Sequence, residues 1–154
     1  MAEIGSAAPE FSLTGSTNQE DTEVSLSDFK GKKLVLLFYP LDFSPVCSEQ
    51  VPDFNENLDA IRAKGADVVA INRDSTFAHK AWSESLGGVD FPLLSDMNLE
   101  VSKQYGMALD EVGITTRGVF ILDGAGKIAF KHVEDAPPDN TLTAEQVLSE
   151  LDKL

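Results

Sequence analysis

The single cysteine of this chain, Cys47, closes a short loop that begins at Pro40 and contains Ser44. A thiolate is a nucleophile and a metal ligand, and a thiol can also pair into a disulfide. Because the chain has one cysteine, it cannot form an internal disulfide, and a disulfide-stapled secreted scaffold is excluded. Any chemistry at Cys47 is therefore that of a free thiol.

The residues around Cys47 predict a loop between a buried strand and a helix. Residues 33–39 (KLVLLFY) are apolar almost without a break, as in a strand covered on both faces in a mainly parallel sheet, and Pro40 ends them. Apolar residues then recur at helical spacing until Gly65: Cys47, Val51, Phe54, Leu58 and Ile61. A sulfur in the first turn of a helix meets free N–H groups and the positive end of the helix dipole, which favour thiolate over thiol. The carboxyl end of a parallel strand is also where α/β sheets place their sites.

Position alone leaves two interpretations of Cys47 open. It is either a small buried hydrophobic residue, as most lone cysteines are, or an activated nucleophile. Ser44 and Pro40 also have simple structural interpretations, as a turn residue ahead of Pro45 and as a strand terminator.

The rest of the chain alternates strands and helices. Residues 67–72 (DVVAIN) and 118–122 (GVFIL) predict two more buried strands, and the turn at 123–126 joins the second of them to residues 127–133 in an antiparallel hairpin. Helices are expected over residues 75–86 with Ser75 or Asp74 as cap, over 98–105 closed by Gly106, and from about Thr143 to the end. We therefore expect an α/β fold with a central mixed sheet, helices on both faces, and a single domain over residues 1–154.

The charge balance excludes several partners. Acidic residues number 26 against 12 basic ones, for a net charge of -14. Such a surface disfavours nucleic acid and anionic membranes. The apolar run at residues 34–39 is far shorter than the ~20 residues of a membrane-spanning helix, and the first residues, MAEIGSAAPEF, do not have the pattern of a secretory signal. We expect a cytoplasmic protein.

No metal or cofactor is expected. With one cysteine, the two histidines, His79 and His132, offer no metal-ligand spacing. Residues 124–127 (GAGK) lack the spacing of a phosphate-binding loop and precede a strand, so a turn is expected there.

The segment FYPLDFSPVC at residues 38–47 resembles the active-site signature of peroxiredoxins, in which a proline, a Thr or Ser and a cysteine follow one another at fixed spacing. Here these residues are Pro40, Ser44 and Cys47. Further segments resemble the family in the same order: residues 8–13, 25–32, 77–82 and 116–122. The resemblance implies a thioredoxin-like fold and a thiol-dependent peroxidase with Cys47 as peroxidatic nucleophile.

The resemblance also implies roles for the neighbouring residues. Arg117 would lie beside the sulfur, hold the thiolate as a fixed cation and donate to a peroxide oxygen. The Ser44 hydroxyl and the backbone N–H groups of Val46 and Cys47 would bind the peroxide oxygens, while Pro40 would pack over the sulfur and exclude water. Without the resemblance, the simplest interpretation of Arg117 is a charged surface residue at the end of a strand.

Further candidate substrate-binding residues are Gln50, Phe43 and Trp82. Gln50 either orients Arg117 or is a solvated helix residue. Phe43 and Trp82 either line the mouth of the pocket or belong to the core or an interface. The resemblance implies a homodimer through the face that includes the active-site loop, which exposed Phe43, Phe77 or Trp82 would suit.

The sequence departs from peroxiredoxins that carry a second, resolving cysteine. The position five after Cys47 is Pro52, and the chain ends at Leu154 without a cysteine-bearing tail. It resembles one-Cys members, the alkyl hydroperoxide reductase E and bacterioferritin comigratory protein types. This implies hydrogen peroxide and organic hydroperoxides as substrates. It also implies an external thiol as reductant, either thioredoxin, a glutaredoxin-like protein or a low-molecular-weight thiol.

Two other functions remain as alternatives to a peroxidase. The first is a peroxide-sensing redox adaptor that signals through oxidation of Cys47. The second is a thiol-disulfide oxidoreductase, which the absence of a Cys-x-x-Cys pair argues against.

Overall fold

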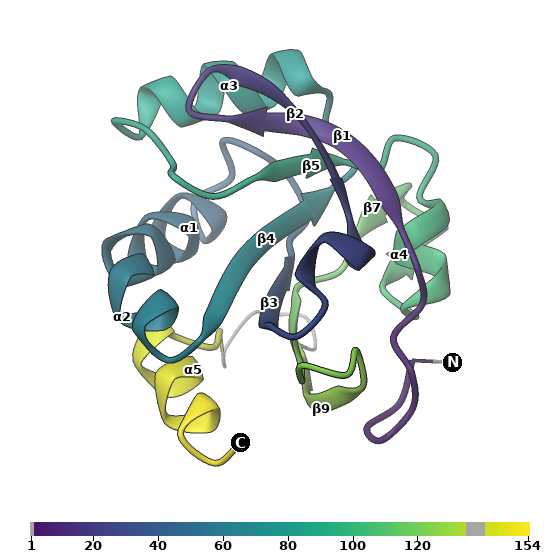
Figure 1. Cartoon of the computed structure of the whole chain (residues 1–154). Helices are drawn as coiled ribbons and strands as arrows, with labels where there is room; N and C mark the ends of the chain where they lie inside the picture. Colours follow the sequence, from purple (N-terminus) through teal and green to yellow (C-terminus); the bar gives the residue numbers. More distant parts are fainter. Residues whose placement is uncertain (1, 135–140) are drawn as a thin grey trace.

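A seven-stranded mixed sheet forms the centre of the computed structural model, which describes residues 2–134 and 141–154 (Figure 1). Its strands, in spatial order, are β2 (Glu20–Ser25), β1 (Ser12–Thr17), β5 (Leu93–Ser95), β4 (Ala66–Asn72), β3 (Lys33–Phe38), β8 (Gly118–Leu122) and β9 (Ile128–Val133). A separate two-stranded ribbon consists of β6 (Ala108–Leu109) and β7 (Ile114–Thr115).

The predicted strands and hairpin are confirmed, with one correction to their pairing. Among the described strands, only β3–β4 and β4–β5 pair in parallel, whereas β8 lies antiparallel to β3 and β9 antiparallel to β8. The expectation that residues 33–39 lie in a mainly parallel sheet is therefore wrong. A strand with one parallel and one antiparallel neighbour is equally buried when both faces of the sheet are covered, so its composition does not distinguish the two cases.

The helices are η1 (Leu26–Phe29), α1 (Cys47–Glu56), α2 (Leu58–Ala63), α3 (Thr76–Ser85), α4 (Glu100–Gln104) and α5 (Ala144–Leu151). Both predicted caps are present: the Ser75 hydroxyl accepts from Ala78 N–H, and Thr143 forms a capping box with Gln146. The single helix expected after Cys47 is instead two helices that meet at Asn57, where the Asn57 side chain bonds the Asp53 carbonyl oxygen at 2.8 Å.

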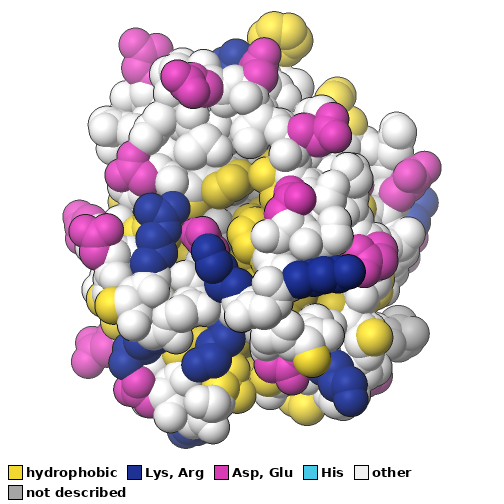
Figure 2. Space-filling view, in the orientation of Figure 1, with side chains coloured by type: hydrophobic (Ala, Val, Ile, Leu, Met, Phe, Trp, Pro, Cys, Tyr) yellow, Lys and Arg dark blue, Asp and Glu magenta, His cyan; other side chains and the backbone are white. Residues whose placement is uncertain are grey.

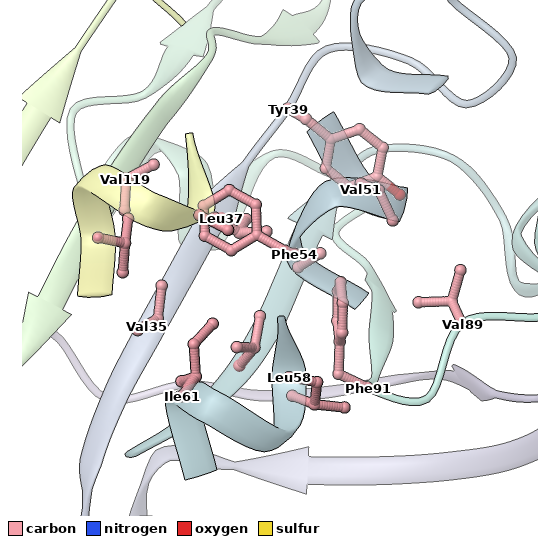
Figure 3. Close-up of a cluster of buried hydrophobic side chains, with 14 of the residues drawn as sticks. Val35, Leu37, Tyr39, Val51, Phe54, Leu58, Ile61, Val89, Phe91 and Val119 are labelled. Carbon is pink, nitrogen blue, oxygen red and sulfur yellow. The ribbon is translucent and has the colours of Figure 1, made fainter. Parts of the chain in front are cut away.

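The core has two halves because successive residues of β3 point to opposite faces of the sheet. Val35 and Leu37 face a cluster that includes Phe54 of α1 and Ile61 of α2, and Figure 3 shows these side chains gathered over the sheet. Leu34, Leu36 and Phe38 face the other cluster, which includes Val101 of α4. The apolar run therefore buries every side chain from Leu34 to Phe38. Full burial stabilises the fold by roughly 1.5–3 kcal/mol for each large side chain.

The amino-terminal hairpin lies outside the predicted elements. Strands β1 and β2 meet at Asn18 and Gln19, which both have positive φ, 47° and 74°. Two such residues form the turn whose twist matches that of paired strands. Gly15 is needed next to β5, because a Cβ there would lie 2.0 Å from the carbonyl oxygen of Leu93.

Charged side chains are unevenly distributed on the face of the molecule shown in Figure 2, where basic side chains gather in the middle and lower half of the view. Within the described part of the chain, no helix has both the length and the apolar character needed to cross a membrane.

Candidate active site

Cys47 is the first residue of α1 and directly follows the loop that leaves the carboxyl end of β3. The residue is fully buried. The backbone N–H groups of Val46 and Cys47 donate to no acceptor among the described residues. Two free donors beside a sulfur at a helix N-terminus favour negative charge on that sulfur and can bind an anionic oxygen.

Arg117 lies against the sulfur. Its Nη2 donates to Cys47 Sγ at 3.1 Å, and its Nη1 donates to Gln50 Oε1 at 2.8 Å. Arg117 precedes β8, and because Gly118 pairs with Phe38, residue 117 lies where β3 ends. The side chain is only 7% exposed, so its charge is little screened by water. The structure thus brings together three residues selected from the sequence, and Gln50 is a buried partner of Arg117 and not a solvated residue.

The Ser44 hydroxyl donates to the carbonyl oxygen of Leu41 at 2.7 Å. Its proton is therefore held inside the loop, while the oxygen keeps its capacity to accept a hydrogen bond. Pro40 and Val46 are half-buried in the same loop. The contacts of these residues with a peroxide remain predictions.

The two candidate aromatic residues occupy opposite environments. Phe43 is 57% exposed and has a positive φ of 66°, which an L-residue adopts at a cost of about 1–2 kcal/mol. Trp82 is only 1% exposed; its ring stacks on Tyr39 with centroids 5.4 Å apart, and its Nε1 donates to Ser48 Oγ. Of the positions expected for Trp82, the core is confirmed, whereas an exposed position at a pocket mouth or dimer face is not, because the residue lies on the inner face of α3. Phe77, on the same helix, is 85% exposed.

A buried polar network that the sequence did not predict supports the loop. Asp42 Oδ2 lies 2.6 Å from His79 Nδ1, and Asp42 Oδ1 accepts from the hydroxyl of Tyr39 at 2.7 Å and from Asn72 Nδ2 at 3.1 Å. Burial, and next the nearby charge of Asp42, raise the pKa of Tyr39 well above its ordinary value. Tyr39 therefore stays a neutral donor, and the network ties the loop to β3, β4 and α3.

Arg117 also has an acidic neighbour, Glu134, that the sequence did not predict. Glu134 Oε2 lies 3.6 Å from Arg117 Nε, and the Glu134 side chain is 3% exposed. The β8–β9 register places Glu134 opposite Arg117, since Gly118 pairs with Val133.

A cavity of about 400 Å³ lies beside the first turn of α1 and is lined by Val46, Gln50, Thr141 and Thr143 among other residues. Within residues 2–134 and 141–154, no group of three or more His, Cys, Asp or Glu side chains could hold a metal ion. A cavity of about 350 Å³ lined by Leu26, Phe29, Lys30 and Lys32 lies at the opposite end of β3 from Cys47.

Comparison with known proteins identifies related sequences. Residues 4–131 match the AhpC/TSA family. Peroxiredoxin-4 of Bos taurus is 38% identical over 162 residues, which cover 99% of this chain and 59% of the relative. The mitochondrial thioredoxin-dependent peroxide reductase of Rattus norvegicus is 42% identical over 136 residues, which cover 84% of this chain and 53% of the relative. The chain thus spans little more than half the length of these two relatives.

Solved structures agree in fold. The crystal structure of Enterococcus faecalis AhpC superposes with a TM-score of 0.91 at 28% identity and covers 99% of this chain and 92% of that one. The reduced 2-Cys peroxiredoxin of Plasmodium vivax gives a TM-score of 0.89 at 27% identity, covering 97% and 80%. The expected thioredoxin-like α/β fold is confirmed. Since the second structure is a 2-Cys protein, the one-Cys type stays a prediction.

Proposed function

Because the chain belongs to the AhpC/TSA family of peroxiredoxins, we propose that it is a thiol-dependent peroxidase with Cys47 as its nucleophile. The observation that carries this proposal is the 3.1 Å contact between Arg117 Nη2 and Cys47 Sγ. A buried cation in contact with the sulfur favours the thiolate, which is the reactive form of cysteine.

The proposed first step is attack of the thiolate on one oxygen of a hydroperoxide. The S–O bond forms as the O–O bond breaks, and the departing oxygen leaves as alkoxide or hydroxide and takes up a proton to give alcohol or water. Arg117 and the N–H groups of Val46 and Cys47 stabilise the charge that develops on the oxygens. The Ser44 oxygen accepts a hydrogen bond from the peroxide O–H, Pro40 shields the sulfur from water, and Cys47 is left as a sulfenic acid.

We further propose the one-Cys cycle for this chain. An external thiol attacks the sulfenic sulfur and releases water to give a mixed disulfide, and a second thiol reduces that disulfide and frees Cys47. The proposal is supported by the presence of one cysteine in the 154 residues. The rat relative is named thioredoxin-dependent, which makes thioredoxin the first reductant to test, ahead of glutaredoxin-like proteins and low-molecular-weight thiols.

Hydrogen peroxide and organic hydroperoxides are the proposed substrates, and a homodimer is the proposed assembly. Phe43 and Phe77, both strongly exposed, are the side chains that a second copy would cover. We also retain the single domain over residues 1–154 and the cytoplasmic location as proposals, although the rat relative is named mitochondrial. The peroxide-sensing adaptor is not favoured, since both relatives are named as peroxiredoxin or peroxide reductase.

Rapid-mixing kinetics test the proposal. Reduced protein is mixed with hydrogen peroxide or cumene hydroperoxide while the fluorescence of Trp82, the single tryptophan, is followed. Trp82 bonds Ser48, the neighbour of Cys47, so its emission should respond to oxidation of the sulfur. Oxidation orders of magnitude faster than that of free cysteine, and absent in Cys47→Ser, is expected. Oxidation at the rate of free cysteine would overturn the proposal, and oxidation followed by no turnover with any thiol would favour the sensing adaptor.

A further inference from the structure

Each of the three guanidinium nitrogens of Arg117 faces a different partner. Nη2 donates to Cys47 Sγ, Nη1 donates to Gln50 Oε1, and Nε lies 3.6 Å from Glu134 Oε2. At this distance the Glu134 contact is an ion pair rather than a hydrogen bond. A planar group held at three corners has a fixed orientation, so the direction in which Nη2 points depends on Gln50 and Glu134 as well as on Arg117.

Glu134 is itself held in place on two sides. Its backbone N–H donates to the Arg117 carbonyl oxygen at 2.9 Å, and its Oε1 accepts from the Thr141 hydroxyl at 2.7 Å. The carboxylate is almost completely buried. A buried carboxylate is costly unless it is paired and hydrogen-bonded, and here Arg117 and Thr141 provide both interactions.

We propose that Glu134 is a positioning residue that holds Arg117 against the sulfur of Cys47 and sets how much of its positive charge acts on the thiolate. The inference rests on the proposed peroxidase function, and it adds a residue that does not touch the reacting atoms. Among the described residues, Arg117 is the one cation that contacts both Cys47 and Glu134. The Cys47 thiolate and the Glu134 carboxylate therefore share its positive charge. Glu134 therefore fixes the geometry of Arg117 and also moderates stabilisation of the thiolate.

When the negative charge of Glu134 is removed, these two effects predict that the Cys47 thiolate forms more easily but reacts more slowly. In Glu134→Gln, the Cys47 thiolate no longer competes with a carboxylate for the positive charge of Arg117. Thiolate absorbance in the far ultraviolet should therefore appear at lower pH than in the wild type. The fully ionised thiolate should nevertheless react with hydrogen peroxide about 10- to 100-fold more slowly, because a small misplacement of a positioning group is enough for such a loss. Glu134→Asp keeps the charge but is shorter, so it should titrate like the wild type and still lose rate.

Two further variants complete the test. Thr141→Val removes the hydroxyl that bonds Glu134 and should lower the rate without changing the charge at the site, and it carries the test if Glu134→Gln fails to fold. Glu145→Gln makes the same charge change at an exposed position of α5 and serves as the matched control. A purely structural Glu134 would lower the unfolding midpoint while leaving the titration and the rate of the folded protein at wild-type values, which would overturn the inference.

The test separates this inference from the proposed function. If wild-type Cys47 reacts no faster than free cysteine, the peroxidase proposal fails, and the titration of Glu134→Gln against wild type still decides whether Glu134 acts on Cys47 through Arg117. If the wild type reacts quickly and both Glu134 variants match it, the peroxidase stands and the positioning role is lost.

Discussion

His79 Nδ1 lies 2.6 Å from Asp42 Oδ2, and neither side chain is accessible to water beyond 1% of its surface. The other ring nitrogen of His79 lies 3.1 Å from the carbonyl oxygen of Leu94, which can only accept a hydrogen bond. Both ring nitrogens therefore lie within hydrogen-bond distance of an oxygen, one of the Asp42 carboxyl group and one of the backbone. This buried pair joins α3 to the loop that ends at Cys47.

Asp42→Asn should destabilise the fold, because it removes a buried carboxylate oxygen that bonds His79, Tyr39 or Asn72. A buried polar group left without its partner costs roughly 1–3 kcal/mol of unfolding free energy. Urea unfolding measures the loss. The matched control is Asp21→Asn, which breaks an exposed ion pair with Lys80 and should cost below about 1 kcal/mol. Equal losses in the two variants would mean that the buried pair contributes no more than a surface one.

Arg117→Lys should slow the oxidation of Cys47 by about 100-fold, the lower end of the loss for one oxyanion-stabilising donor. Lysine keeps the positive charge, but its single ammonium group cannot bond the sulfur and Gln50 with separate, fixed nitrogens. Trp82 fluorescence after rapid mixing with hydrogen peroxide gives the rate. Arg62→Lys, at an exposed position of α2, should leave the rate unchanged. A wild-type rate in Arg117→Lys would show that charge alone is sufficient.

Gly118→Ala should destabilise the site from within the sheet. A Cβ at Gly118 would lie 2.3 Å from Met107 Cε and 2.9 Å from the carbonyl oxygen of His132. The methionine can move, but the carbonyl belongs to strand β9, so overpacking should cost about 1–3 kcal/mol and displace the adjoining Arg117. Thermal unfolding and the oxidation rate report the two effects. The control is Gly124→Ala, whose Cβ would lie at an ordinary 3.5 Å from the backbone, so its free energy of unfolding should be close to that of the wild type. An unchanged free energy of unfolding in Gly118→Ala would mean that strands β8 and β9 move apart at no cost.

Elements with strong local signals could be predicted from the sequence. Strand β3 is buried on both faces and is continuously apolar, and the caps at Ser75 and Thr143 depend only on residues within the first turn of each helix. The β1–β2 hairpin has no such signal, because its strands are rich in Ser, Thr and acidic residues and bury only a few side chains. Its turn at Asn18 and Gln19 is recognisable only from backbone dihedral angles.

The residues of the candidate site also differ in how well the sequence predicts their proximity. Cys47 and Gln50 lie on one helix turn, so their proximity follows from sequence spacing, whereas Arg117 was placed by resemblance to the family. Asp42 and His79 meet across 37 residues of chain, and only the tertiary fold brings them together. Glu134 is predictable only if the hairpin register is known, and the irregularity between Ile121 and Leu122 shifts a simple count from the turn by one residue.

The ionisation of the two tyrosines of the chain, Tyr39 and Tyr105, should be coupled to unfolding. Burial raises the pKa of both hydroxyls, with a further contribution from Asp42 at Tyr39 and from Glu10 at Tyr105. In the unfolded chain both ionise near pH ~10, so above that pH the unfolded state has lost protons that the folded state keeps. The free energy of unfolding is therefore fully retained below pH ~10 and falls above it, by about 1.4 kcal/mol per pH unit for each tyrosine.

Two measurements check this expectation. The tyrosinate absorbance of the folded protein should stay low until alkaline unfolding and then appear cooperatively, whereas in concentrated guanidinium chloride it should appear near pH ~10. Urea unfolding at increasing pH should show a shallower decline in Tyr39→Phe and in Tyr105→Phe than in the wild type. The two hydroxyls donate to different acceptors, Asp42 and the Pro9 carbonyl oxygen, so each variant should remove about half of the pH dependence. Gradual tyrosinate formation in the folded protein near pH ~10 would contradict the prediction and would mean that the hydroxyls reach solvent without unfolding.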